Sequence, residues 1–133
     1  MSKSNVAIYR ATDGRVGGHE LGLPLCLLST TGRKSGKQRT LPLLYLEDGG
    51  RYVVIASLGG APKHPIWYLN LLANQAATIQ VGSRTLAVTA ETAAPEERKR
   101  LWPLAVQMYG SYENYRAKTE REIPVVVLTP APA

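Results

Sequence analysis

Short apolar runs separated by glycine-containing turns dominate this sequence, and they predict strands that are mostly antiparallel. Asp48-Gly-Gly50 leads into the β-branched run Tyr52–Ser57, a pattern typical of a hairpin. Gly82-Ser83 joins Ala77–Val81 to Thr85–Ala90, and both of these segments alternate with the period of a strand. Such short connections join antiparallel neighbours, because parallel strands need a long crossover.

The remaining segments predict a small barrel with helices packed on it. Further strands are expected at Leu25–Ser29, at Arg39–Leu46 with a break, edge position or bulge at Pro42, and at Ile123–Leu128. A helix is expected at Pro65–Asn74, with a buried face made by Ile66, Leu69 and Ala73 beside Trp67 and Leu71, and another from Pro95 to Tyr109 with a break near Pro103. About six strands and two helices close most simply as a β-barrel.

The length of 133 residues fits one domain, which we divide into an N-terminal segment, 1–20, and a barrel, 21–130. A single cysteine, Cys26, excludes a disulfide framework and indicates a reducing, cytoplasmic setting. Two histidines are too few for a metal site, and no apolar run is long enough for a membrane span. Val6, Ile8 and Tyr9 form a weak amphipathic pattern, from which we hypothesise contact with the inner face of the plasma membrane.

Positive charge is concentrated in the middle of the chain. The formal net charge is +6, and residues 21–90 hold seven cations against two anions. Four of these cations fall within residues 33–39, which predicts an anionic partner such as a phosphorylated small molecule. A nucleic acid is disfavoured, because the cations occupy one turn instead of a face with interleaved aromatic residues.

Gly32-Arg-Lys-Ser-Gly36 lies between two expected strands and combines flexible glycines with cations. The glycines let the backbone turn with exposed N–H groups, and Arg33 and Lys34 add charge-assisted hydrogen bonds, so the turn could hold a phosphate. The glycine spacing is not that of a P-loop. An exposed hairpin end whose charges protect the edge strands explains the same residues, and both interpretations stay open.

A second junction, Ser57-Leu-Gly-Gly60, joins a strand to a helix. Its backbone amides could hydrogen-bond a ring carbonyl or a developing negative charge, although a tight turn without a ligand is the simpler explanation. His64 near the helix start is more typical of a capping or packing residue than of a catalyst.

Tyr109, Tyr112 and Tyr115 recur at a spacing of three residues. On one helix they would share a face and could form the wall of a pocket for a flat aromatic ring. Gly110-Ser111 interrupts the helical pattern, so a flexible lid is an alternative, as is ordinary packing against the end of the barrel.

Four motifs in this order resemble the deazaflavin (F420)-dependent nitroreductase and quinone reductase family, and the resemblance covers about residues 25–128. The motifs are Leu28-Ser-Thr-Thr-Gly-Arg-Lys-Ser-Gly36, Arg39-Thr-Leu-Pro-Leu43, Val53-Val-Ile-Ala-Ser-Leu-Gly-Gly60 and His64-Pro-Ile-Trp-Tyr-Leu-Asn-Leu-Leu-Ala-Asn74. The resemblance implies a split β-barrel of the flavin-reductase-like, pyridoxamine-phosphate-oxidase-like class. It also implies that reduced coenzyme F420 passes a hydride to a quinone or nitroaromatic acceptor.

The resemblance further implies roles for individual residues. The cofactor's phosphate and acidic tail would contact Arg33, Lys34, Ser35, Lys37 and Arg39; the ring would lie near Ser57, Leu58, Gly59, Gly60, Pro65 and Trp67; and the substrate wall would be Tyr109, Tyr112 and Tyr115. Ser57 and Tyr112 are the expected catalytic hydroxyls. Family members have Lys or Asn where this chain has Leu58, so a cation beside the ring is missing here.

Two alternatives stay open at this point. The barrel could bind or carry F420 without turnover, or it could bind flavin mononucleotide or haem. The sequence does not set the oligomeric state.

Overall fold

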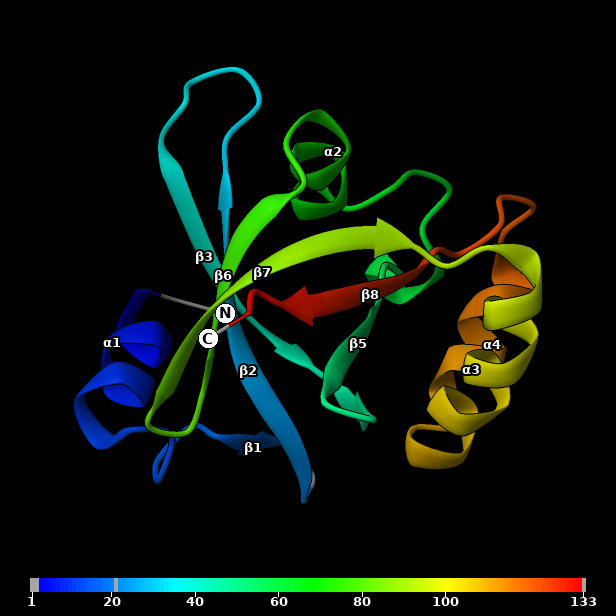
Figure 1. The fold of residues 1–133 in the computed structure, drawn as a ribbon. Helices are drawn as coiled ribbons and strands as arrows, with labels where there is room; N and C mark the ends of the chain where they lie inside the picture. Colours follow the sequence, from blue (N-terminus) through cyan, green and yellow to red (C-terminus); the bar gives the residue numbers. More distant parts are fainter. Residues whose placement is uncertain (1–2, 21, 133) are drawn as a thin grey trace.

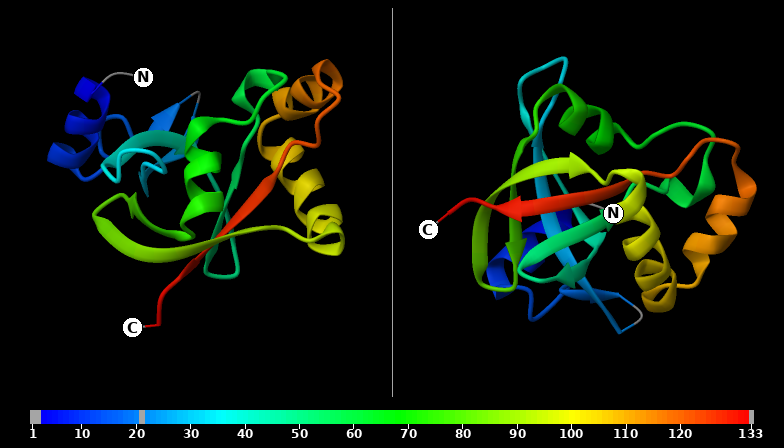
Figure 2. Two further views of the ribbon diagram at one scale, coloured as in Figure 1. Left: turned by 90° about the horizontal axis from the view of Figure 1, so that it is seen from above. Right: turned by 45° about the vertical axis from the view of Figure 1, so that its right-hand side comes forward.

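The structure, a computed structural model, describes residues 3–20 and 22–132 (Figures 1 and 2). Eight strands form one curved antiparallel sheet in the order β1-β2-β6-β7-β8-β5-β4, and β3 pairs with the opposite edge of β2. The strands are β1 (His19–Glu20), β2 (Leu23–Thr31), β3 (Gln38–Leu44), β4 (Leu46–Asp48), β5 (Arg51–Ile55), β6 (Ala76–Val81), β7 (Arg84–Thr92) and β8 (Val125–Pro130).

Four α-helices and a short 3-10 turn surround this sheet. In Figure 1, α2 lies above the barrel, α3 and α4 lie together on the right, and α1 lies on the left. The helices are α1 (Lys3–Thr12), α2 (Ile66–Ala73), α3 (Pro95–Met108) and α4 (Ser111–Lys118), and the turn η1 is Leu58–Gly60.

The predicted hairpins and the barrel architecture are confirmed. Gly49 and Gly50, with φ of 57° and 85°, form the two-residue turn between Asp48 and Arg51. Gly82, with φ of 60°, lies in the turn between β6 and β7. Both turns need the left-handed backbone that glycine adopts without strain.

The core lies on both faces of the sheet, which explains the uninterrupted apolar run of β5. Val54 faces the barrel interior together with Cys26, Ile79 and Leu128. Its neighbour Val53 faces outward and packs with α3 and α4. Because both faces of β5 are covered, neither set of alternating residues needs to be polar.

The element count exceeds the predicted six strands and two helices. Strand β1 has two residues and pairs with β2, and strand β4 has three residues and pairs with β5. Strands this short are too brief to show an alternating pattern in the sequence. The predicted break at Pro42 is wrong, because β3 continues through it, whereas the predicted edge position is correct. The predicted break near Pro103 is also wrong: this proline is exposed, so the helical carbonyl that it leaves unpaired can reach water.

Helix α2 buries only part of the face that was predicted. Trp67 and Leu71 are buried as expected, whereas Ile66 is 69% exposed and Ala73 is also exposed; Tyr68 and Asn70 are buried in their place. The helix is apolar on nearly every side, so its periodicity did not identify the side that faces the barrel.

Helix α1 is held to the barrel by the phenol of Tyr9. The hydroxyl lies 2.9 Å from Leu25 O and 3.1 Å from Gln80 O, and it accepts a hydrogen bond of 3.0 Å from Gly82 N–H. Tyr9 is therefore buried, while Ile8 beside it is 43% exposed. Among the described residues, every helix is too short or too polar to cross a bilayer. The division of the chain at residue 20 stays a prediction.

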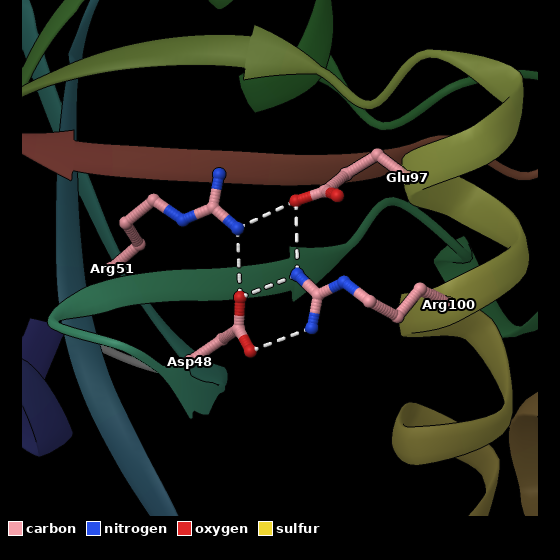
Figure 3. A network of polar contacts seen from close by, with 4 residues as sticks. All are labelled: Asp48, Arg51, Glu97 and Arg100. Atoms are coloured by element: carbon pink, nitrogen blue, oxygen red, sulfur yellow. Dashed lines mark hydrogen bonds and ion pairs between the residues drawn. The ribbon is translucent and has the colours of Figure 1, made fainter.

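A four-residue ionic network joins the β4–β5 hairpin to α3 (Figure 3). Arg100 donates to both carboxylate oxygens of Asp48, at 2.9 and 2.8 Å. Arg51 donates to Asp48 Oδ2 at 2.7 Å and to Glu97 Oε1 at 2.5 Å. Bidentate pairing of this kind fixes geometry better than an isolated surface ion pair.

We expect this network to make stability depend on pH. Hydrogen bonds from Arg100, and then from Arg51, hold the pKa of Asp48 well below its usual range. The carboxylate therefore stabilises the fold above its unfolded-state pKa, and this contribution is lost as the pH falls through the lower folded-state pKa. Urea unfolding at about pH 7 and about pH 3 should show a smaller acid-induced loss of stability in Asp48→Asn than in the wild type. Glu96→Gln is the matched control, since its carboxylate is 90% exposed; an equal loss in all three proteins would contradict the prediction.

Candidate functional site

A cleft of about 1410 Å³ lies beside β3, η1 and α2. Most of its lining residues come from five segments, 32–35, 39–44, 57–59, 63–70 and 109–115, and Leu25 and Ile55 complete the wall. The cationic turn, the glycine junction and the tyrosines therefore belong to one cavity, large enough for a cofactor-sized ligand.

The free edge of β3 forms one wall of the cleft. Tyr45 N–H donates to Pro24 O at 3.3 Å, which sets the alternation of hydrogen bonds between β3 and β2. Alternate residues of a strand direct their N–H groups to opposite edges. Because Tyr45 faces β2, the backbone N–H groups of Leu44 and Thr40 face the unpaired edge. Pro42 shares that edge and has no N–H, so it leaves no donor unpaired. The cleft wall thus offers backbone polar groups between leucine side chains.

The cationic turn is closed by its own hydrogen bonds. Gly32 N–H donates to Lys37 O at 2.8 Å, and Gly36 N–H donates to Gly32 O at 2.8 Å. A Cβ on Gly32 would lie 2.8 Å from Ser35 Oγ, which can rotate away, and 3.1 Å from Lys37 O, so a larger residue would crowd this compact turn. Ser35 Oγ also accepts from Lys37 N–H at 3.2 Å. The turn is a defined structure whose cations extend from a fixed backbone.

Asn70 of α2 fixes the start of this turn. Its Oδ1 accepts from Arg33 N–H at 3.1 Å, and its Nδ2 donates to Thr30 Oγ1 at 3.2 Å. Asn70 is 2% exposed, so the loss of either partner would leave a buried polar group unpaired. The sequence analysis missed this residue, although a lone Asn in an apolar helix was a visible indication.

The glycine junction forms the turn η1 at the opposite end of the cleft. Leu58, Gly59 and Gly60 have φ of 44°, 62° and 82°. A left-handed Leu costs about 1 kcal/mol, so the surrounding contacts must hold it in place. Leu58 is 47% exposed and lines the cleft, which makes this part of the wall apolar.

Arg121, which precedes β8, holds this turn through backbone carbonyls. Its Nη2 donates to Ser57 O at 2.7 Å, its Nη1 to Ala56 O at 3.2 Å and its Nε to Ala61 O at 2.8 Å. Nη1 also lies 3.1 Å from His64 Nδ1. Nothing near Arg121 in the sequence indicates this role, because its partners are about 60 residues away in the chain.

The three tyrosines meet, although they do not share one helix, which was one of the arrangements that the spacing left open. Tyr109 follows the last residue of α3, whereas Tyr112 and Tyr115 belong to α4, and the chain leaves the helical conformation at Tyr109, which has φ of -143° and ψ of 97°. The ring centroids are 5.0 Å apart for Tyr109 and Tyr112 and 6.3 Å apart for Tyr112 and Tyr115. The hydroxyls of Tyr109 and Tyr115 lie 3.1 Å apart.

Tyr112 is the most buried of the three, at 5% exposure. Burial, and then the neighbouring Tyr109 and Tyr115, raise the pKa of its phenol well above the ordinary value. The hydroxyl therefore stays protonated at neutral pH and is better suited to donating a hydrogen bond than to releasing its proton.

The structure brings most of the predicted site residues to the cleft. The wall includes Arg33, Lys34, Ser35, Arg39, Ser57, Leu58, Gly59, Pro65, Trp67, Tyr109, Tyr112 and Tyr115. Lys37 and Gly60 are adjacent to this wall without lining it. The sequence analysis did not assign Lys63 and Asn70 to the site, and it considered His64 only as a packing residue; all three line the cleft.

Comparison with known proteins relates this cleft to one family. A family model described as F420H(2)-dependent quinone reductase matches residues 1–130. The F420H(2)-dependent quinone reductase Rv1261c of Mycobacterium tuberculosis is 45% identical over 127 residues, which cover 92% of this chain and 85% of the relative. A solved F420-H2 dependent reductase (FDR-A) is 46% identical, with a TM-score of 0.74 over 79% of this chain and 93% of that one.

A more distant structure agrees with the predicted fold class. A protein described as a putative pyridoxamine 5'-phosphate oxidase from Listeria innocua is 11% identical, with a TM-score of 0.58 over 98% of this chain and 95% of that one. At this identity the likeness concerns the fold alone. It confirms the predicted barrel class.

Gly60 should be essential for the tyrosine wall. A Cβ at this position would lie 2.8 Å from Tyr115 O and 3.0 Å from Tyr115 Cα, in a backbone with φ of 82°. Gly60→Ala must therefore displace α4, and we expect a loss of about 1–3 kcal/mol in the free energy of unfolding beyond that of Gly59→Ala. Gly59 is the matched control, because its φ is 62° and a Cβ there would meet no atom within 4 Å. Equal stability of the two variants in urea unfolding would contradict this account.

Proposed function

The chain belongs to the F420H(2)-dependent quinone reductase family, and we propose that its cleft holds reduced F420 between the cationic turn and the tyrosines while a quinone is reduced there. The observation that carries this proposal is one cavity lined both by the cations of the turn, Arg33 and Lys34, and by three phenols. Such a cavity suits a ligand with an anionic tail and a flat ring.

The residues of the cleft fit this cofactor. Its cationic end offers guanidinium and ammonium groups on a turn that Asn70 fixes. Its opposite end offers the backbone of η1, where Gly59 leaves open space for a flat ring to approach. Trp67 and Pro65 add apolar surface between these ends. The cleft therefore offers cations for an anionic tail and an apolar, glycine-containing surface for a flat ring.

The proposed cofactor contacts divide into two groups. The phosphate and acidic tail would be held by Arg33, Lys34, Ser35, Lys37 and Arg39, and the ring by the backbone of Ser57, Leu58, Gly59 and Gly60 together with Pro65 and Trp67. Arg can form a planar pair with phosphate or carboxylate, whereas Lys supplies a point charge. Leu58 presents an apolar side chain to the proposed ring position, whereas Lys63 and His64 line the cleft nearby.

Reduced F420 supplies a hydride, and a quinone that accepts a hydride and a proton becomes a hydroquinone. The task of the protein is to orient the acceptor, to exclude water and to stabilise the negative charge that develops on its oxygen. Tyr109, Tyr112 and Tyr115 would form the wall for the acceptor. The protonated hydroxyl of Tyr112, or that of Ser57, would donate a hydrogen bond to the developing oxyanion.

Nitroaromatic compounds are a second proposed acceptor class. They are flat and carry two acceptor oxygens on one group, so the same phenols could orient them. Contact with a membrane surface also stays a proposal. Ile8 is exposed on α1 and could support it, whereas Tyr9 points into the protein.

The direct test is to mix purified protein, reduced F420 and menadione. We expect the deazaflavin to be oxidised only when protein and quinone are both present. Tight fluorescence quenching of F420 without oxidation would instead identify a carrier.

Removing the cations of the turn should weaken F420 binding. We expect Arg33→Ala combined with Lys34→Ala to raise the Kd by about tenfold or more and to reduce its dependence on salt, because ion pairing supplies part of the attraction. Fluorescence titration at several salt concentrations measures both effects. Arg84→Ala is the control, since this exposed cation on β7 lies outside the cleft wall. An unchanged Kd at low salt would exclude the two residues from the site.

Tyr112→Phe should slow turnover without weakening the binding of F420. Loss of one hydrogen bond to a developing charge predicts a decrease in kcat of about tenfold. Because burial raises the pKa of Tyr112, the ratio of wild-type to variant rates should stay constant from about pH 6 to about pH 9. Steady-state rates with menadione and fluorescence titration of F420 measure the two effects. An unaltered kcat would deny Tyr112 a chemical role.

A further inference from the structure

The hydrogen bond between Arg121 and His64 determines where the imidazole carries its proton. A guanidinium has only donors, so at 3.1 Å from Arg121 Nη1 the His64 Nδ1 must be the acceptor. A neutral imidazole that accepts at Nδ1 carries its hydrogen on Nε2. Arg121 therefore selects one of the two neutral tautomers of His64.

His64 is also placed to meet a ligand. It lines the same cleft as Ser57 and Tyr112, and its ring packs on Tyr68 with a centroid distance of 4.9 Å. Pro65 follows it directly and begins α2, which restricts the backbone of His64. Within the described part of the chain, Nε2 has no hydrogen-bond partner, so its hydrogen is available to a ligand.

The surroundings of His64 favour the neutral form. Burial, and then the charge of Arg121, lower the pKa of the imidazole below its ordinary value. A neutral Nε2–H can stabilise developing negative charge on an oxygen without being consumed as an acid.

We propose that Arg121 is a positioning residue that holds His64 as the Nε2–H tautomer, and that His64 donates this hydrogen bond to a carbonyl oxygen in the cleft. The inference rests on the proposed function, because the carbonyl belongs either to the deazaflavin ring or to the quinone. Through the same guanidinium, Arg121 also holds the carbonyls of Ser57 and Ala61, so one side chain aligns the η1 turn with the imidazole.

The first test needs no cofactor. In protein labelled with 15N-histidine, we expect the His64 spectrum to show an unprotonated, hydrogen-bonded Nδ1 and a protonated Nε2 at neutral pH. The chain has two histidines, and the spectrum of His64→Asn assigns the resonances. Arg121→Met should give a mixture of tautomers. A protonated Nδ1 in the wild type would overturn the proposal, whether or not the Arg121 variant folds.

The second test compares two replacements of His64. Asn places its oxygen near the position of Nδ1 and keeps an acceptor for Arg121, but it has no group at the position of Nε2. Gln can place an amide N–H close to the position of Nε2. We expect His64→Asn to lose about tenfold in activity and His64→Gln to recover part of that loss. Equal activity of His64→Asn and the wild type would overturn the donor role.

Binding and rate measurements identify the carbonyl. If His64 contacts the deazaflavin, His64→Asn should raise the Kd of F420 in fluorescence titration. If it contacts the quinone, the Kd should stay unchanged while kcat/KM for menadione falls. A wild-type protein with the expected tautomer but no turnover would refute the proposed function and the donor role, and it would leave the positioning role of Arg121 standing. Normal turnover with a protonated Nδ1 would refute the positioning role of Arg121 and leave the proposed function standing.

Discussion

The guanidinium of Arg121 is the contact on which the η1 side of the cleft depends. It donates to three carbonyls between Ala56 and Ala61, a segment that includes the left-handed residues Leu58, Gly59 and Gly60. In a turn with three successive positive φ angles, interactions within the turn alone do little to offset the backbone strain. Charge-assisted hydrogen bonds supply that stability from outside the turn.

Helix α2 connects the two ends of the cleft. Asn70 holds the backbone of the cationic turn, while His64, just before the helix, contacts Arg121, which in turn holds the carbonyls around η1. The buried residues Trp67 and Leu71 anchor this helix in the barrel core. The spacing between the cationic turn and η1 is therefore set by a packed helix rather than by a flexible loop.

Much of the barrel could be predicted from the sequence, because its hairpins carry local glycine turns such as Gly49-Gly50. The cationic turn and the tyrosines were also visible as motifs. The sequence analysis missed Arg121 because its role comes from a long-range contact, and it misjudged α2 because an apolar helix gives no contrast between faces. Tyr9 was assigned to a surface pattern because the residues that its hydroxyl contacts, Leu25, Gln80 and Gly82, are distant from it in the sequence.

Arg121 contacts residues that are distant in the sequence, and this separation affects the order in which the protein folds. Its partner Ser57 is 64 residues earlier in the chain, and β8 pairs with β5 across a similar separation. Closing so large a loop carries an entropic cost that must be met before these contacts form. On a ribosome, the early hairpins can form while later residues are still being added, but the contacts that hold η1 cannot form until the segment around Arg121 has emerged. The η1 side of the cleft should thus be among the last parts of the molecule to become ordered.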